Sequence, residues 1–395
     1  MIMNNTEFSK LIQPIELSSF LEKHWEKFPF FLRREHPDYY SKLVSINDID
    51  SIIYCSKPSS MAFNNGKPSF QSHTKNSVYD LYKTYSEGNT VTVYGIHQCW
   101  KPVSFLCRNI ESFFNCPIHA NLYLTPRNSQ GLSPHFDSHD VFILQVEGEK
   151  HWRVYDDSFQ SFPLFMDNTI EYTVPRNQLP SCLKEVTLHR GDLLYIPRGF
   201  VHEAFTSECC SAHLTIGVNT FKWIDLISQA FVAVTKRNKS FRRSLPIGFL
   251  DNNNVNTKDN LALFRKYSEE LLRLLPDTVI YEDAVNEINK RFFANLQPLP
   301  DGHFSQIDKI DKINLDTVVT IREGMFNNIL STKDTTSIEF PGNVINGPSY
   351  IEEALHNISN LKQFPVKAVS ENLTDEAKLV LVRRFIKEGL LKTVV

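Results

Sequence analysis

The sequence predicts an α+β protein in which a β-barrel or jelly roll is followed by helices and a small α/β unit. Residues 89–220 contain many short segments of alternating apolar and polar side chains, separated by close turns, which is typical of barrels and jelly rolls. After residue 221 the apolar residues recur at helical spacing. Residues 303–395 are expected to form the last unit, which mixes strands and helices.

Before the barrel zone, helices are expected at residues 17–28 and 45–54, where apolar side chains recur every three or four positions. Within the zone, strands are expected at residues 90–94, 121–125, 141–146, 150–155, 185–188, 193–196 and 212–218. The pairs Glu147-Gly148 and Gly191-Asp192 are interpreted as turns, because these residue types favour turn conformations.

Helices are then expected at residues 223–234, 261–275 and 279–296. A connection that contains Pro298, Pro300 and Gly302 separates them from the last unit. The clearest element of that unit is a helix at residues 374–392. Thr374 is expected to cap this helix, and acidic residues in its first turn favour the helix dipole.

Charge and cysteine content limit the classes of protein to which this chain can belong. The 395-residue chain has 42 Lys and Arg against 45 Asp and Glu, so no basic excess points to nucleic acid. The basic run at residues 236–243 is interpreted as a solvated linker. None of the seven cysteines forms a C-x-x-C pair, which indicates reduced thiols. Without a visible signal peptide or a long apolar stretch, a cytoplasmic protein without membrane contact is expected.

A His-x-Asp pattern at His135 and Asp137 is the main chemical feature. Side chains at i and i+2 of an extended segment point the same way, so both can reach one ion inside a barrel. His202, just past a turn into a new strand, is the expected third ligand. A second such pair, His36 and Asp38, is rejected because it precedes the barrel zone and encloses a proline.

Two imidazoles and one carboxylate leave three positions of an octahedral ion open, the facial triad of non-haem Fe(II) oxygenases. A 2-oxo acid and O2 would use those positions. The alternative is a hydrogen-bonded core pair plus an unrelated surface histidine. Two other histidines are interpreted more conservatively. His139 is expected to orient a neighbour or line the substrate cleft, and His213 to be a hydrogen-bonded core residue or a support for a ligand.

Lys150 is predicted to point into the barrel, because it shares a strand face with Trp152 and Val154. A buried ammonium is unfavourable unless an anion meets it. The distal carboxylate of 2-oxoglutarate would be that anion. The alternative is an exposed hairpin lysine beside Glu147 and Glu149.

Three segments resemble the JmjC/cupin-type oxygenases of the ribosomal-oxygenase group in their bacterial form: NLYLTPRNSQG, PHFDSHDVFILQVEGEKHWRVY and GDLLYIPRGFVHEA. FLEKHWEKFPFFLRR resembles the opening helix and strand of that group, and LTDEAKLVLVRRFIKEGLL its winged-helix domain. The resemblance implies a double-stranded β-helix (cupin, JmjC) catalytic domain at residues 1–221. It also implies a helical dimerisation domain at 222–300 and a winged-helix domain at 301–395.

By position, the resemblance implies that His135, Asp137 and His202 hold iron. It implies that Lys150 binds the far carboxylate of 2-oxoglutarate and that Asn121 lines the cosubstrate pocket.

One position departs from the group. A small hydroxyl residue is frequent where this chain has Gly217, and glycine offers no side-chain hydrogen bond. Thr215, two residues away on the same strand face, is the candidate to compensate as a cosubstrate-binding residue.

The implied function is an Fe(II)- and 2-oxoglutarate-dependent oxygenase that uses O2 to hydroxylate a protein or peptide side chain, with a ribosomal protein as the implied substrate. A biosynthetic precursor peptide or a small molecule is the alternative substrate. A non-catalytic cupin-fold binding module is the alternative of another class, although such modules typically lose a ligand or the lysine. A zinc hydrolase would accept the same ligands, but no general base is placed to support it. No direct nucleic-acid partner is expected.

The resemblance also implies a homodimer through the helical region. Two apolar faces there are extensive: Trp223, Leu226, Ile227, Phe231 and Val234 on one, and Leu261, Phe264, Leu271, Leu272 and Leu275 on the other. One face can pack on the barrel, and the other needs a partner. The alternative is an intramolecular bundle that uses both faces.

Overall fold

The computed structural model describes residues 6–56, 60–64, 67–72, 78–158, 161–163, 172–249 and 258–394. Contacts divide the chain into two compact units, Met1–Thr220 with Leu299–Asp301 and Phe221–Pro298 with Gly302–Val395. Each unit contains helices and strands, which confirms the mixed class. Among the described helices, none combines the length and the apolar character needed to cross a lipid bilayer.

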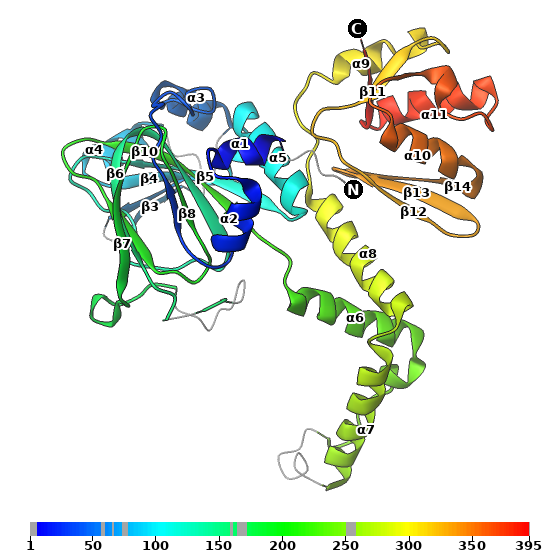
Figure 1. Ribbon diagram of the computed structural model, residues 1–395, viewed down its shortest axis with the longest axis horizontal. Helices are drawn as coiled ribbons and strands as arrows, with labels where there is room; N and C mark the ends of the chain where they lie inside the picture. Colours follow the sequence, from blue (N-terminus) through cyan, green and yellow to red (C-terminus); the bar gives the residue numbers. More distant parts are fainter. Residues whose placement is uncertain are drawn as a thin grey trace. The chain divides into compact units, whose positions relative to one another are not determined.

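The first unit is built on a curved sheet that wraps around an interior (Figure 1). Its strands follow the order β1-β8-β6-β10-β5-β4-β2-β3, and β7 and β9 also pair with β6. The strands are β1 Phe30–Leu32, β2 Ser60–Asn64, β3 Lys67–Ser72, β4 Thr90–Val93, β5 Ile118–Thr125, β6 Asp140–Tyr155, β7 Cys182–His189, β8 Leu193–Ile196, β9 His202–Phe205 and β10 Ser211–Val218. The strands expected from alternation at residues 90–94, 121–125, 185–188, 193–196 and 212–218 are therefore present.

Strand β6 is one continuous element, so the turn expected at Glu147-Gly148 is wrong. Gly148 has a φ of 63°, a left-handed conformation that glycine adopts without strain. The register against β10 shifts between Ala212 and His213. An irregularity of this kind bends a strand without ending it. The first half of β6 consequently pairs with β8 and β10, and the second half with β7 and β9.

Alternation along β5, β6 and β10 separates a packed core from the barrel interior. The core-facing side chains of these strands include Ala120, Leu122, Phe142, Leu144, Leu214 and Ile216. They share one cluster with side chains of α1 (Thr6–Ile12), α2 (Leu17–Lys23) and α5 (Lys101–Phe114). Because successive side chains of a strand point to opposite faces, residues 119, 121, 123 and 125 of β5 face the interior.

The helices of the first unit match the sequence only in part. α3 (Ile46–Ser56) coincides with the helix expected at 45–54. α2 ends at Lys23, before the expected end at residue 28, and Glu26 has a positive φ of 56° that is incompatible with a continuing helix. α4 (Val78–Ser86) and α5 were not predicted. A proline in the first turn of α5 was the available start signal.

The second unit begins with three helices near the expected positions: α6 Trp223–Arg237, α7 Lys258–Leu274 and α8 Thr278–Asn295. A small cluster of Ala233, Val234 and Ile280 joins α6 to α8, and Leu271, Leu274 and Leu275 pack against it. Part of each apolar face that the sequence revealed is therefore used within the helical region itself.

Two three-stranded sheets follow, in the orders β15-β11-β16 and β12-β13-β14. The elements are α9 Phe304–Asp308, β11 Val318–Ile321, β12 Asn328–Ser331, β13 Thr335–Phe340, β14 Asn343–Pro348, α10 Glu352–Asn360, β15 Phe364–Pro365, α11 Asp375–Lys387 and β16 Leu391–Thr393. As predicted, Thr374 caps α11, where its hydroxyl accepts a hydrogen bond from the Ala377 N–H at 3.3 Å. The helix ends at Lys387, because the chain then turns into β16.

Candidate metal centre and cosubstrate cavity

A short antiparallel pairing places His135 beside His202. The His135 N–H donates to the His202 carbonyl at 3.1 Å, and the His202 N–H donates to the His135 carbonyl at 2.7 Å. Their ring centres lie 4.4 Å apart. The Gly199 N–H donates to the Asp137 carbonyl at 2.9 Å, which fixes the third residue to the turn that leads into β9. Backbone hydrogen bonds thus assemble side chains that lie far apart in the sequence.

The two imidazoles share one tautomer. Nδ1 of His135 lies 2.8 Å from the Ser133 carbonyl, and Nδ1 of His202 lies 3.0 Å from the Phe200 carbonyl. A carbonyl can only accept, so each Nδ1 carries the proton and each Nε2 keeps its lone pair. Metal-binding histidines are commonly oriented in this way.

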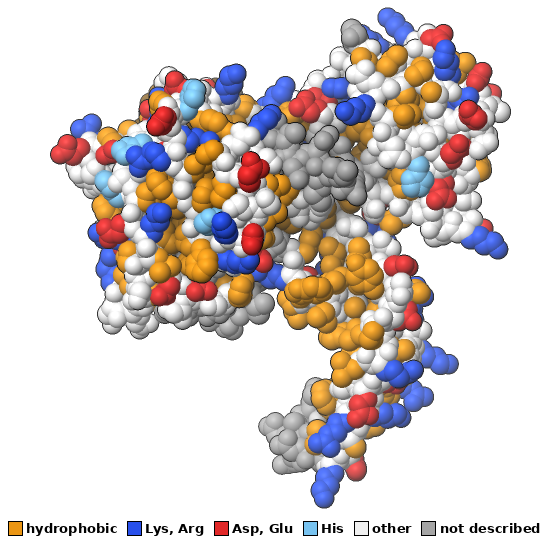
Figure 2. Space-filling model, in the orientation of Figure 1, with side chains coloured by type: hydrophobic (Ala, Val, Ile, Leu, Met, Phe, Trp, Pro, Cys, Tyr) orange, Lys and Arg blue, Asp and Glu red, His pale blue; other side chains and the backbone are white. Residues whose placement is uncertain are grey.

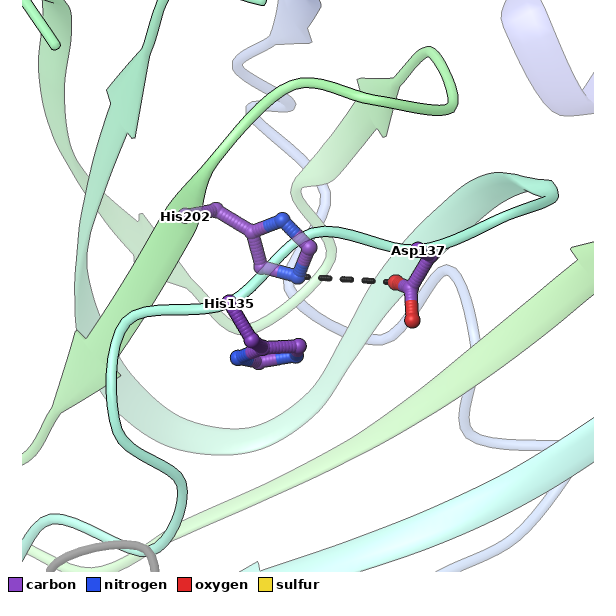
Figure 3. Close-up of side chains that lie close together, drawn as sticks. All are labelled: His135, Asp137 and His202. Carbon is purple, nitrogen blue, oxygen red and sulfur yellow. Dashed lines mark ion pairs between the residues drawn. The ribbon is translucent and has the colours of Figure 1, made fainter. Parts of the chain in front are cut away.

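Asp137 completes the cluster. Its Oδ2 lies 3.6 Å from Nε2 of His202 (Figure 3). One ligand atom from each of His135, Asp137 and His202 lies within 4.8 Å of the others. The rejected pair plays no part in this site, since Asp38 instead forms an ion pair with Arg190 at 2.7 Å.

The charge states at this cluster suit a divalent cation. Burial, reinforced by His135, lowers the pKa of His202 to about 4. Burial alone would raise the pKa of Asp137, but His139, His202 and other neighbouring histidines outweigh it and hold this pKa below its usual range. At neutral pH the site therefore offers a carboxylate and a neutral imidazole, the forms that bind metal. Two nitrogens and one oxygen fit Fe(II) by donor type.

The cluster lies on the wall of a cavity of ≈ 280 Å³. The lining side chains are Thr90, Tyr94, His119, Asn121, Tyr123, Leu132, His135, Asp137, His139, Val141, Ile143, Lys150, Trp152, His202, Ala204, His213 and Thr215, together with Gly131. All six side chains that the sequence proposed for metal and cosubstrate thus face the same space. His139 lines the cavity as well, as expected.

Lys150 points into the cavity and is 4% exposed, so it is not an exposed hairpin lysine. Its Nζ donates to Thr125 Oγ1 at 2.9 Å and lies 5.9 Å from the Trp152 ring centre. Burial lowers its pKa to about 7. Within the described stretches of the chain, no carboxylate forms an ion pair with this ammonium. An anion in the cavity would stabilise its charged form.

Asn121 and Thr215 stand opposite each other on β5 and β10, and both line the cavity. The Oδ1 atom of Asn121 accepts a hydrogen bond from the Gly95 N–H at 3.0 Å. This bond fixes the amide, whose NH2 group remains a donor.

The packing around position 217 explains why this residue is a glycine. A Cβ atom there would lie 2.1 Å from Cε1 of His119 and 2.7 Å from Cδ2 of His139. Nδ1 of His119 accepts from the Asn219 amide at 2.9 Å, so its Nε2 carries the proton when the ring is neutral. The imidazole of His119 occupies the space that a side chain at position 217 would need.

Tyr123 and Thr125 were missed as site residues. Tyr123 lines the cavity and stacks on His213 with ring centres 4.9 Å apart. Burial raises the pKa of Tyr123, so its hydroxyl keeps its proton. Alternation along β5 was the available signal, because Asn121, Tyr123 and Thr125 fall on one face.

Residues 96–226 match a family model described as the JmjC domain. This segment of the chain is therefore similar to JmjC domains. The matched segment contains His135, Asp137, His202 and Lys150, so the sequence resemblance to JmjC oxygenases of the ribosomal-oxygenase group is supported.

Curated relatives and solved structures are also similar to this chain. The chain is 29% identical over 316 residues to the bifunctional lysine-specific demethylase and histidyl-hydroxylase NO66 of Aedes aegypti, covering 75% of this chain and 49% of that protein. It is 28% identical to ribosomal oxygenase 1 of Danio rerio, covering 74% of this chain and 57% of that protein. The chain thus spans about half the length of these curated relatives.

The ribosomal oxygenase YcfD of Escherichia coli, solved in complex with cobalt and 2-oxoglutarate, is similar to this chain in fold. Its TM-score is 0.59 at 20% identity, and the match covers 97% of this chain and 99% of that one. A further structure of YcfD gives a TM-score of 0.60. At this identity, the likeness establishes the JmjC cupin-type fold.

Proposed function

We propose that this protein is an Fe(II)- and 2-oxoglutarate-dependent oxygenase that hydroxylates a side chain of a ribosomal protein. One observation carries the proposal: His135, Asp137 and His202 line the same cavity as a buried lysine without a carboxylate partner among the described residues. A metal site and a site for the far end of a dicarboxylate are both needed for this reaction. The relatives named histidyl-hydroxylase and ribosomal oxygenase support the substrate class.

In this proposal the triad holds Fe(II), and Lys150 binds the distal carboxylate of 2-oxoglutarate. Asn121 and Thr215 line the space between them and contact the cosubstrate. The iron, when bound, supplies O2 activation, with 2-oxoglutarate as the source of two electrons and succinate and CO2 as its products. The protein's own part is to keep the imidazoles neutral, fix their orientation through Ser133 and Phe200, and surround the cosubstrate with buried side chains.

Two measurements test this function. Purified protein with Fe(II) and O2 should convert 2-oxoglutarate to succinate, and the rate should rise when ribosomal proteins are added. Ribosomal proteins from cells without the gene should lack a one-oxygen mass gain that wild-type cells show. A one-oxygen mass gain on a small peptide or a metabolite instead would indicate that this molecule is the substrate. The absence of any turnover, with metal and 2-oxoglutarate bound, would favour a binding module.

The domain roles are part of the same proposal. Residues 1–221 would be catalytic, 222–300 would dimerise, and 301–395 would form a winged helix that packs or docks substrate rather than binding nucleic acid. We place the protein in the cytoplasm, which cell fractionation can test.

Exposed apolar side chains in the helical region support the homodimer. Trp223 is 79% exposed, Phe264 64% and Leu272 65%, and apolar atoms gather over α6 in Figure 2. Patches of this kind mark interaction sites. Val234, Leu271 and Leu275 are not available to a partner, because they pack within the helical region.

Light scattering decides the oligomeric state. A mass near twice 45.6 kDa supports the dimer, and a mass near 45.6 kDa refutes it. Trp223→Asp with Leu272→Asp should give a folded monomer whose melting temperature no longer depends on protein concentration. Leu271→Asp serves as the contrast, because it should lower the melting temperature by disrupting the internal cluster.

A further inference from the structure

His213 lies on the cavity wall in a position that its packing does not explain. It is 1% exposed and lines the cavity. Its ring stacks on Tyr123 at 4.9 Å and meets the edge of Trp152 at 5.5 Å. The two aromatic rings hold the imidazole in a fixed orientation.

One nitrogen of this imidazole has no hydrogen-bond partner in the described part of the protein. Nδ1 of His213 is buried and has no hydrogen-bond partner among the described residues. At Nδ1, His213 is therefore not the hydrogen-bonded core residue that was one of two expectations, while the other, a support for a ligand, stays a prediction. Burial, with a smaller contribution from Lys150, lowers its pKa far below the usual value. The ring is neutral and carries its proton on one of its two nitrogens. Because Nδ1 has almost no accessible surface, Nε2 is the nitrogen through which the ring can donate to a ligand in the cavity.

Strand register places this donor beside Lys150. His213 stands opposite Tyr123, in the row between Thr215 opposite Asn121 and Ser211 opposite Thr125. Thr125 is the residue that accepts from Lys150 Nζ. His213 thus lies between two positions. On one side are Asn121 and Thr215, which are proposed to contact the cosubstrate, and on the other is Thr125, which accepts a hydrogen bond from Lys150.

We propose that His213 donates a hydrogen bond to the distal carboxylate of 2-oxoglutarate, so that His213 and Lys150 hold this group at two points. The inference rests on the proposed function, because it takes 2-oxoglutarate as the ligand. It assigns His213 a binding role instead of a packing role. An ammonium alone attracts any anion, whereas a second, rigid donor fixes which carboxylate oxygen meets which group.

The test compares two 2-oxo acids that differ at the distal end. Both 2-oxoglutarate and 2-oxopentanoate have five carbons and the same metal-chelating group, but 2-oxopentanoate ends in a methyl group. Their affinities are measured by calorimetry on the full-length protein loaded with Mn(II), which avoids turnover. His213→Phe keeps a ring to stack on Tyr123 and removes both nitrogens.

For His213→Phe we expect about tenfold weaker binding of 2-oxoglutarate and unchanged binding of 2-oxopentanoate. His213→Gln, whose amide nitrogen can stand near the position of Nε2, should recover part of the affinity. His189→Phe is the control, because His189 is half-exposed on β7 and does not line the cavity.

Each outcome is informative. If the wild-type protein with Mn(II) does not bind 2-oxoglutarate, the proposed function itself fails. If the wild type binds and His213→Phe loses affinity for neither acid, or equally for both, His213 only packs and the inference is overturned. Should His213→Phe fail to fold, His213→Leu, which is smaller, carries the same comparison.

Discussion

The two ends of the cavity hold their polar atoms differently. At the metal end, formed by His135, Asp137 and His202, each imidazole Nδ1 is tied to a backbone carbonyl. At the lysine end, formed by Lys150, Thr125 and His213, a buried ammonium has one hydroxyl as its hydrogen-bond partner and Nδ1 of the imidazole has none among the described residues.

This difference separates a preorganised site from one that its ligand completes. Backbone carbonyls orient the metal-end donors before anything binds, which favours a fixed coordination geometry. The lysine end keeps donors in a poorly hydrated pocket, where their unpaired state is unfavourable. Binding of a carboxylate would remove that cost. Mutations at the metal end should therefore abolish the reaction, while mutations at the lysine end should weaken the binding of the cosubstrate.

The largest effect is expected for Asp137→Ala and for His135→Ala. Each removes a metal ligand, so Mn(II) binding and 2-oxoglutarate turnover should fall below detection while the melting temperature of the metal-free protein changes little. Asp137→Glu should also fail, because one methylene moves the carboxylate by about 1 Å in a preorganised site. Calorimetry with Mn(II) and a succinate assay measure both effects. Full turnover in either alanine variant would contradict the triad.

Lys150→Ala should keep metal binding and lose the cosubstrate. The lost charge-assisted hydrogen bond corresponds to about 2–3 kcal/mol, or roughly 30–150-fold in affinity for 2-oxoglutarate. Lys150→Arg should retain part of the affinity. The apparent KM for 2-oxoglutarate, measured at saturating Fe(II), reports the change. An unchanged KM in the alanine variant would mean that another basic residue binds the carboxylate.

The buried lysine also predicts a pH dependence of stability in the protein without cosubstrate. Its pKa falls from 10.5 to about 7 on folding, so between these values the unfolded chain binds the extra proton. Stability contributed by this position should therefore rise with pH across that window, approaching about 1.4 kcal/mol per pH unit. Urea denaturation of the wild type and of Lys150→Met, compared from pH 7 to pH 10, isolates this contribution. Parallel profiles for the two proteins would show that Lys150 does not change its pKa on folding.

Gly217→Ser tests whether the hydroxyl frequent in related oxygenases fits this chain. The new Cβ would overlap His119, so we expect a loss of about 1–3 kcal/mol in the free energy of unfolding and no gain in 2-oxoglutarate affinity. Adding His119→Ala to Gly217→Ser should recover part of the stability, because it makes room for the side chain. A stable single mutant with tighter 2-oxoglutarate binding would show that the His119 side chain moves aside at little cost in free energy.

The sequence predicted features that depend on alternation and on local signals. Parity on β6 was sufficient to place Lys150 inside, and the Thr374 cap marked the start of α11. The bend at Gly148 could not be distinguished from a turn, because both require a glycine at positive φ. Only the pairing of β6 with four other strands shows that the chain continues through it.

The lysine end was only half predictable for a similar reason. Lys150 carries a charge. A charged side chain at an inward-facing strand position is unusual, so the sequence alone marks it as a candidate site residue. His213 and Thr125 are ordinary strand residues until the registers of β5 and β10 place them beside that charge. Whether a buried nitrogen has a partner is a property of the assembled cavity and cannot be determined from spacing.

The smallest effect is expected at Thr125, which faces the barrel interior and contacts Lys150 but does not line the cavity. Its Oγ1 accepts from Lys150 Nζ at 2.9 Å and from Thr90 Oγ1 at 3.1 Å. Thr125→Val keeps the shape of the side chain and removes the acceptor, so the ammonium loses its anchor and 2-oxoglutarate should bind roughly three- to tenfold more weakly. Thr125→Ser keeps the hydroxyl and should behave like the wild type. Because the lysine itself remains, kcat at saturating cosubstrate should change little. A fall in kcat at unchanged KM would instead connect Thr125 to the metal end, and the separation of the two ends would be wrong.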